Sequence, residues 1–337
     1  MALRLIEVVV PDEQCEELRE SFSEHRVIHV WETSAADGLV TLRVLLDAEH
    51  VEGVSDLMAD RLDLREDFRL FVLPVEATLP RAEDAEEDES PDDEQENDQE
   101  KQPLPERISR EELYEDLVNA SRLTVVYLVM VGLSTLVAAV GLVRDDVAII
   151  IGAMVIAPLL GPNIALSLAC ALGDLALARR SLKAIGAGLA VAGAASLAIG
   201  TLLTVDPGIP AIASRTSPDL ADVAIALAAG VAGSLAFTSG VPAVVVGVMV
   251  AVALLPPLVA AGLLIAAGEP AAATGATMLL LANVACVNLA AVATFLVQKV
   301  RPRRWWEADR ARKATWVAAL TWIVMLLILI AAMSLNS

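Results

Sequence analysis

The chain has 337 residues, 56% of them hydrophobic, and a formal net charge of −20. Residues 1–121 hold 35 of the 44 acidic residues but only 11 of the 24 Lys and Arg residues, so the first third is soluble and acidic and the rest is a membrane domain. An acidic soluble part argues against nucleic acid and against docking on anionic lipid as its partner.

The reactive residues form no enzyme or metal motif. Cys15, Cys170 and Cys286 are far apart without CxxC spacing, and all three histidines lie within the first 50 residues. No HExxH, GxSxG or phosphate-binding glycine pattern is present. We therefore expect no enzyme, no bound metal and no cofactor, and any transport must run downhill or be coupled to an ion gradient.

The first 79 residues alternate between strand and helix patterns. The periodicity predicts strands at 3–10, 27–31, 39–46 and 68–75, and helices at 12–22 and 50–62. The order βαββαβ is that of ferredoxin-like or ACT-like domains. Such a domain can bind a small ligand or pair with a neighbour, and the fold alone does not decide between them.

An acidic stretch follows this domain. Residues 80–106 combine acids with Pro and Gln, which predicts a disordered, self-repelling linker. In the segment 107–121, Ser109 and Glu112 have the spacing of a capping box, which predicts a helix over 110–119. Its apolar residues fit the membrane surface or a partner subunit, and a simple lead-in helix is favoured over a switch.

Seven apolar stretches then predict seven membrane-spanning helices, each near or above the roughly 20 residues that a span requires. They are 123–143, 147–172, 182–205, 220–238, 241–267, 271–298 and 314–335. Basic residues concentrate after the second and sixth stretches, which places these loops inside. The expected location is the plasma (inner) membrane of a prokaryote, with the N-terminus cytoplasmic and the C-terminus outside. The many acids and few Lys residues fit a halophilic source, and a high-GC genome explains the preference for Arg over Lys equally well.

The membrane domain contains an internal repeat. Shifting the segment 152–174 by 95 residues lays it on 247–269 without a gap, so that Pro162 meets Pro257 and Asp174 meets Glu269. Because a unit of three spans ends on the opposite side of the bilayer from its start, a second unit joined by a simple loop enters from that opposite side. The sequence therefore predicts a 3+3 inverted repeat with broken helices. Repeat one covers 122–205, repeat two covers 217–300, and the helix at 314–335 is extra.

Proline and glycine interrupt the second span and its repeat. Pro158 and Pro162 each remove a backbone N–H, and Gly161 between them permits unusual dihedral angles, which predicts about one unwound turn near mid-membrane. Freed backbone groups there can hold an ion or a charged substrate group, and Asn163 beside them can donate and accept. Pro256 and Pro257 predict an equivalent break in the second repeat. The alternative is a pair of kinks that serve only helix packing.

Other polar residues are weaker candidates for the site. Asn283 and Asn288 lie inside the sixth span. They either form hydrogen bonds that hold helices together or contact a ligand. Arg215 is a candidate anion contact or gate, and Asp222, about one turn into the fourth span, can face a cavity or be solvated. Asp174 and Glu269 are either gate charges or solvated helix ends. Asp219 is expected to cap the fourth span.

Small residues repeat along the third span at Gly186, Ala190, Ala194 and Ala198. This stripe predicts close helix packing, within one subunit or between subunits. The stripe also makes a homo-oligomer the expected assembly.

Several of these segments resemble a known family. The run 151–162, the segment 214–219, the small-residue segment 228–233 and the sequence Leu254–Pro257 are similar to the DUF389 hydrophobic membrane proteins of bacteria and archaea, over roughly residues 108–300. The resemblance implies a membrane protein, and a transport role only through its architecture. We expect a secondary transporter or permeation pathway for an unknown small solute or ion; a membrane-anchored ligand sensor is the alternative, and an ion channel the third.

Overall fold

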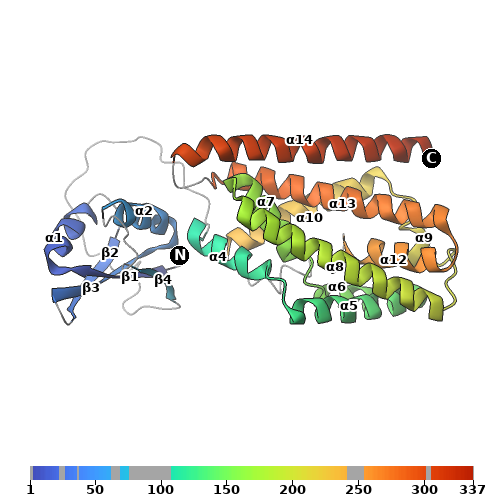
Figure 1. The fold of residues 1–337 in the computed structure, drawn as a ribbon, viewed down its shortest axis with the longest axis horizontal. Coiled ribbons are helices and arrows are strands. Elements are labelled where there is room, and N and C mark those ends of the chain that lie inside the picture. Colours follow the sequence, from blue (N-terminus) through green and yellow to red (C-terminus); the bar gives the residue numbers. More distant parts are fainter. Residues whose placement is uncertain are drawn as a thin grey trace, which may run out of the picture. The chain divides into compact units, whose positions relative to one another are not determined.

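The computed structural model describes residues 3–22, 27–35, 38–61, 69–75, 108–240, 254–300 and 305–336 (Figure 1). These fall in two compact units, Met1–Glu112 and Leu113–Ser337. The predicted linker 80–106 and residues 241–253 of the fifth predicted span lie outside the described residues.

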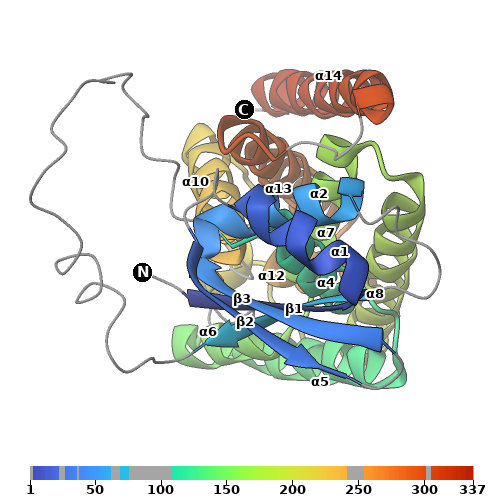
Figure 2. The ribbon, with the colours of Figure 1, turned by 90° about the vertical axis from the view of Figure 1, so that its left-hand side faces the viewer.

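The first unit has the predicted element order. Its elements are β1 (Leu3–Pro11), α1 (Asp12–Ser21), β2 (Val27–Ser34), β3 (Leu39–Asp47), a 3-10 turn (Ala48–His50), α2 (Val51–Arg61) and β4 (Leu70–Val75). The strands form one antiparallel sheet in the order β2-β3-β1-β4. Both helices lie on one face of this sheet (Figure 2), so the connections β1-α1-β2 and β3-α2-β4 each cross over a neighbouring strand.

Alternation along the strands separates a core face from an open face. On β1, Ile6, Val8 and Val10 are buried and pack with Leu18 and Met58 from the two helices. The residues between them point to the opposite side of the sheet, because successive side chains of a strand alternate. That side is not covered by α1 and α2.

Helix α4 (Arg110–Ala120) begins at the predicted residue, but only one of the two hydrogen bonds of the predicted capping box forms. The Ser109 hydroxyl accepts the backbone N–H of Glu112 at 3.2 Å. The Glu112 carboxylate does not complete the box, because it accepts two hydrogen bonds from the Arg4 guanidinium instead, at 3.0 and 2.9 Å. A bidentate pair with an arginine is a stronger contact than a hydrogen bond to a backbone amide.

The second unit is helical. Its further helices are α5 (Val125–Val143), α6 (Val147–Ile156), α7 (Leu160–Leu172), α8 (Leu175–Leu202), α9 (Pro210–Ala213), α10 (Leu220–Thr238), α12 (Leu255–Ala266), α13 (Pro270–Val297) and α14 (Trp305–Asn336). Four of these helices are long and apolar enough to cross a bilayer, and α6 with α7 makes a fifth, bent candidate. Within the described residues, α12 and the apolar part of α14 (Thr315–Ala331) are shorter.

The helix ends repeat with the same offset as the sequence. Helices α5 and α10 both have 19 residues and begin at residues 125 and 220. Helices α8 and α13 both have 28 residues and begin at residues 175 and 270. Gly173 and Gly268, which precede these two long helices, both have a left-handed φ, of 71° and 79°. The 95-residue correspondence therefore extends from side-chain identity to helix boundaries and to the backbone conformation of these glycines.

Packing between the two halves is reciprocal. Between the halves, α8 packs against α12 and its counterpart α13 packs against α7, while α5 contacts α12 and α10 contacts α7. Within the halves, α5 packs against α8 as α10 packs against α13. These contacts of one half therefore have equivalents in the other.

The small-residue stripe predicted for the third span is not an internal contact. Gly186, Ala190, Ala194 and Ala198 are all exposed on α8. The buried face of this helix is a different set of small residues, Ser181, Ala184, Gly188, Ala192, Ser196 and Gly200. Because α8 carries small residues on both faces, the four-residue spacing alone could not tell which face packs within the chain.

Candidate functional site at the broken helix

The second predicted span is interrupted at Pro158. Helix α6 ends at Ile156, α7 begins at Leu160, and their axes are bent by 53°. The last carbonyls of one helix and the first amides of the next have no partner within their own helix. Pro162 is the third residue of α7, a position where a missing N–H is tolerated because no earlier carbonyl of that helix is available to it.

Gly161 has a different role from the one expected. It lies partly buried in the first turn of α7 with ordinary helical backbone, rather than in an unwound segment with unusual dihedrals. A Cβ atom added to it would lie 2.8 Å from the Cβ atom of Ala120 and 3.1 Å from the Ala120 carbonyl oxygen. The glycine is therefore needed for the close approach of α4, not for backbone freedom.

The second repeat resumes its helix at the equivalent residue. Helix α12 begins at Leu255, 95 residues after Leu160, with Pro256 and Pro257 buried in its first turn. Pro257 is the third residue of α12, as Pro162 is of α7. Residues 241–253, directly before Leu254, lie outside the described part of the chain.

Buried amides join α7 to α13 next to the break. Asn288 donates to the side-chain oxygen of Asn163 at 3.1 Å and to the Val284 carbonyl at 2.9 Å. Its own side-chain oxygen accepts the Ser167 hydroxyl at 3.0 Å. Asn163 also donates to the Leu159 carbonyl at 2.8 Å, in the break itself.

This network uses both N–H donors of the Asn288 amide group and one of the two acceptor sites on its oxygen. Asn163 and Asn288 are 3% and 0% exposed, so the network is shielded from solvent. In this conformation both residues hold helices together, and they keep the start of α7 in place. Asn283 is also buried on α13, more than one turn away from Asn288.

Helix α4 lies alongside α7, in the opposite direction. At one end the Tyr114 hydroxyl donates to the Asp174 carboxylate at 2.7 Å, and at the other Ala120 meets Gly161. Asp174 also caps α8 by accepting the amides of Ala176 and Leu177, so this candidate gate residue is a helix cap in the structure. Burial, then the bond to Asp174, raises the pKa of Tyr114 to about 12.

Ionisation of Tyr114 should loosen α4 at high pH. A folded-state pKa above the ordinary 10.0 means that the folded chain holds this proton more tightly, so stability is lost as the pH rises from 10.0 toward 12. Since the chain has two tyrosines, Tyr127→Phe leaves Tyr114 as the only phenol. Its ultraviolet titration should show a midpoint near 12, which Asp174→Asn should lower. An unshifted midpoint would contradict the contact.

The remaining charged candidates lie near helix starts. Asp219 caps α10, and the Asp222 carboxylate accepts the Asp219 amide at 3.0 Å, which completes a capping box. The Arg215 guanidinium, half-buried, donates to the Ala211 carbonyl. Burial lowers the pKa of Arg215, against the attraction of Asp222. Glu269 precedes α13 without a capping hydrogen bond from its side chain.

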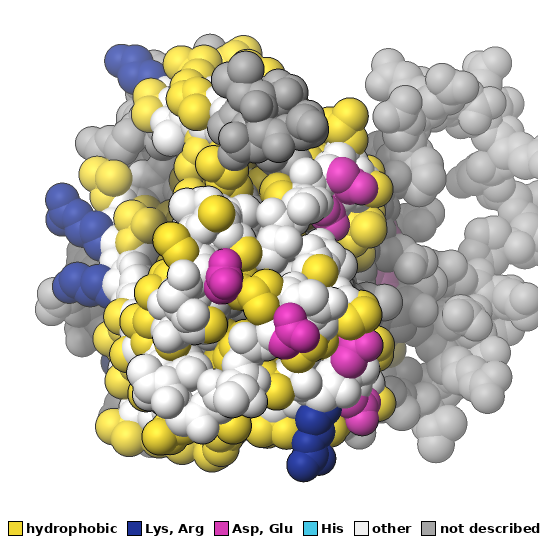
Figure 3. All heavy atoms as spheres, turned by 90° about the vertical axis from the view of Figure 1, so that its right-hand side faces the viewer, with side chains coloured by type: hydrophobic (Ala, Val, Ile, Leu, Met, Phe, Trp, Pro, Cys, Tyr) yellow, Lys and Arg dark blue, Asp and Glu magenta, His cyan; other side chains and the backbone are white. Residues whose placement is uncertain are grey.

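The loops that carry these residues meet at one end of the second unit. The Ala211 amide donates to the Asp145 carboxylate at 2.8 Å, which joins the loop after α5 to α9. Acidic side chains gather on this polar end, bordered by apolar helix surfaces (Figure 3). The loops contain more acids than bases, whereas Arg179, Arg180 and Lys183 lie in the first turns of α8 at the other end.

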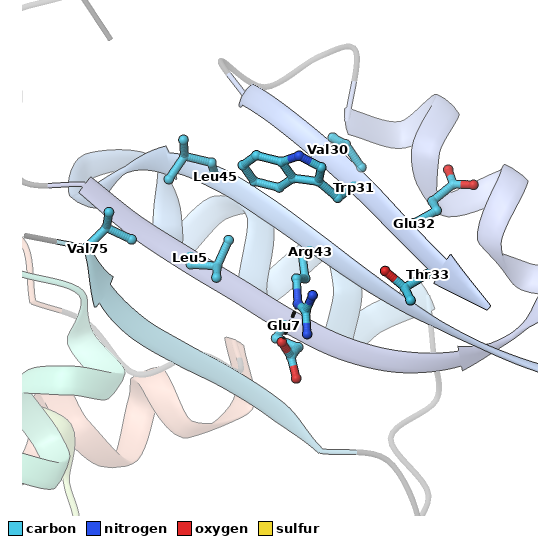
Figure 4. Close-up of a pocket in the computed structure, with 9 residues that line it drawn as sticks. All are labelled: Leu5, Glu7, Val30, Trp31, Glu32, Thr33, Arg43, Leu45 and Val75. Atoms are coloured by element: carbon cyan, nitrogen blue, oxygen red, sulfur yellow. Dashed lines mark hydrogen bonds and ion pairs between the residues drawn. The ribbon is translucent and has the colours of Figure 1, made fainter. Parts of the chain in front are cut away.

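The first unit contains a second region of interest, on the open face of its sheet. A shallow concavity of about 740 Å³ is lined by Leu5, Glu7, Val30, Trp31, Glu32, Thr33, Arg43, Leu45 and Val75 (Figure 4). Arg43 donates to the Glu7 carboxylate at 2.6 Å near its centre. None of these residues was predicted as a site from the sequence, although their alternation with buried residues of β1 and β3 marks them as one face.

Comparisons with known proteins agree with the sequence resemblance. The family described as "Domain of unknown function (DUF389)" matches residues 154–289. The chain is 37% identical over 297 residues to a protein of Methanocaldococcus jannaschii named "Uncharacterized protein MJ0678", an alignment that covers 88% of each chain. No solved structure matches the chain.

Proposed function

The chain belongs to the DUF389 family, and we propose that it is a secondary transporter or permeation pathway for a small solute or ion. The observation that carries this proposal is the interruption of an apolar span at Pro158, beside a buried polar network. Helix ends and amide groups are costly inside a bilayer unless protein, water or a ligand satisfies them. A break kept there favours a function that needs polar groups at that depth.

The proposed pathway lies between two inverted halves. Two findings support this arrangement: the helix ends repeat after 95 residues, and the packing between the halves is reciprocal. In Figure 1, α8 leads from the α7 end of the bundle toward α9, whereas its counterpart α13 leads from the α12 end back toward the start of α14. Opposite directions of equivalent helices are what an inverted repeat requires.

The proposed topology has seven spans, with the N-terminus cytoplasmic and the C-terminus outside. The basic residues near the start of α8 and the acidic loops around α9 support it, because positive residues favour the cytoplasmic side. The fifth span would contain α12 and the seventh α14. In this topology α4 approaches the broken helix from the cytoplasmic side.

The prolines of the break provide the test. Pro162→Ala restores an N–H that can bond to the carbonyl of residue 158 and removes the ring that blocks it, so α7 can extend back into the break. Pro257→Ala does the same in the second repeat. We expect the double variant to lose most uptake in proteoliposomes that contain a sodium-sensitive or a pH-sensitive dye.

Pro270→Ala is the matched control, since Pro270 is the first residue of α13 and lies outside the break. It should retain uptake. If the double variant transports as the unaltered chain does, the breaks are not the pathway.

A ligand sensor without transport is the second candidate function. The concavity on the open sheet face favours it, because a shallow site with an indole and an ion pair can receive a small molecule. Removing residues 1–79 separates the two: retained uptake supports the pathway, whereas a chain without flux under any gradient supports the sensor. Conductance that does not saturate would instead indicate a channel.

A further inference from the structure

One row of side chains crosses all four strands on the open face of the sheet. Trp31 on β2 is paired with Arg43 on β3, Arg43 with Glu7 on β1, and Glu7 with Phe71 on β4. Directly paired residues of neighbouring strands project to the same side. The row therefore reads aromatic, positive, negative, aromatic, with the ion pair at its centre and one ring at each end.

Several large apolar side chains on this face are exposed. Trp31 is 43% exposed and Phe71 49% exposed, and Leu73 in the neighbouring row is 44% exposed. In that row Leu5 is paired with both Leu45 and Leu73. Large apolar side chains grouped on one face of a soluble unit indicate a contact surface rather than scattered surface residues.

We propose that a second copy of this chain covers the face, with the two sheets stacked about a two-fold axis parallel to the strands. Such an axis reverses the order of the row in the opposing copy. Arg43 of one copy then lies opposite Glu7 of the other, and Trp31 lies opposite Phe71. An axis perpendicular to the strands would instead oppose Arg43 to Arg43, so charge selects the first arrangement.

The charge balance of the face favours a like partner over an oppositely charged one. The first 121 residues are strongly acidic, but Arg43 and Glu7 neutralise each other across the centre of the face. A basic partner would be attracted to the acidic surfaces elsewhere on the domain. A second copy of the chain can pack on this face because the face carries no net charge at its centre. Both copies would also be held in one bilayer, which raises their effective concentration, so a small interface is sufficient.

The predicted opposition of Trp31 and Phe71 can be tested by cross-linking. Two differently tagged full-length chains, one with Trp31→Cys and one with Phe71→Cys, are co-expressed, reconstituted in lipid and treated with a short bis-maleimide. We expect a cross-linked mixed pair, several-fold more abundant than the homodimer from either variant alone. The unaltered chain, in which Cys15 and Cys286 are buried, is the background. Gln14→Cys, exposed on α1, is the control on the helix side.

Charge exchange provides a second measurement. Arg43→Glu in both chains brings four carboxylates together at the centre and should abolish the cross-link. The double variant Arg43→Glu/Glu7→Arg in both chains keeps the ion pairs with reversed sense and should restore it. If Gln14→Cys cross-links as well as the mixed pair, or if Arg43→Glu has no effect, the proposal is wrong. A mixed pair that fails to cross-link in membranes also overturns it, and leaves a small ligand or another protein as the occupant.

Discussion

Asn288→Ala is expected to lower the free energy of unfolding of the membrane unit by about 1–2 kcal/mol. The substitution removes the donor to the Asn163 side-chain oxygen, which is then buried without that partner at the broken helix. Ser167 is affected less, because its hydroxyl also lies within bonding distance of the Asn163 and Asn288 backbone carbonyls. The start of α7 loses its polar link to α13, so we expect uptake to fall as well.

The unfolding midpoint in mixed micelles of increasing SDS content measures this loss. Asn119→Ala is the control, since Asn119 is exposed on α4 and should leave the midpoint unchanged. A double-mutant cycle with Ser167→Ala isolates the network, because the two side chains share a hydrogen bond and their effects should not add. Additive losses would show that the network is not a unit.

Gly161→Leu is expected to destabilise the same region by about 1–3 kcal/mol, because a larger side chain must fit where even a Cβ atom lies 2.8 Å from that of Ala120. The backbone of α4 or the first turn of α7 has to move. Since the first turn carries Pro162 and Asn163, we also expect reduced uptake.

Two variants make this prediction specific. Gly186→Leu, at an α8 position with no atom within 4 Å of an added Cβ atom, should be tolerated within one chain. Ala120→Gly should recover part of the loss caused by Gly161→Leu, because it removes the nearest atom but leaves the carbonyl oxygen. If Ala120→Gly gives no recovery, the α4–α7 contact does not explain the glycine.

Local patterns of the sequence predicted the elements well. Two-residue alternation marked the four strands to within a few residues, and the prolines marked the interruption between α6 and α7. Apolar length marked α5, α10 and α13, although α8 begins at Leu175, seven residues earlier than the predicted start. The reason is that its first turns carry three basic residues, which hydropathy alone counts as a loop.

The offset of 95 residues was the most informative feature of the sequence, and it predicted that one helix would begin where its counterpart does. Pairings between distant segments were decided only by the tertiary structure. Sequence could name Asn163 and Asn288 but not that they bond to each other, since they are 125 residues apart on different helices. The sequence likewise shows a glycine at 161 and small residues along α8. It does not show which face of each helix meets a neighbour, because that depends on how the helices are rotated in the bundle. Local periodicity determines the elements of this protein, whereas contacts across the fold determine what its glycines and amides do.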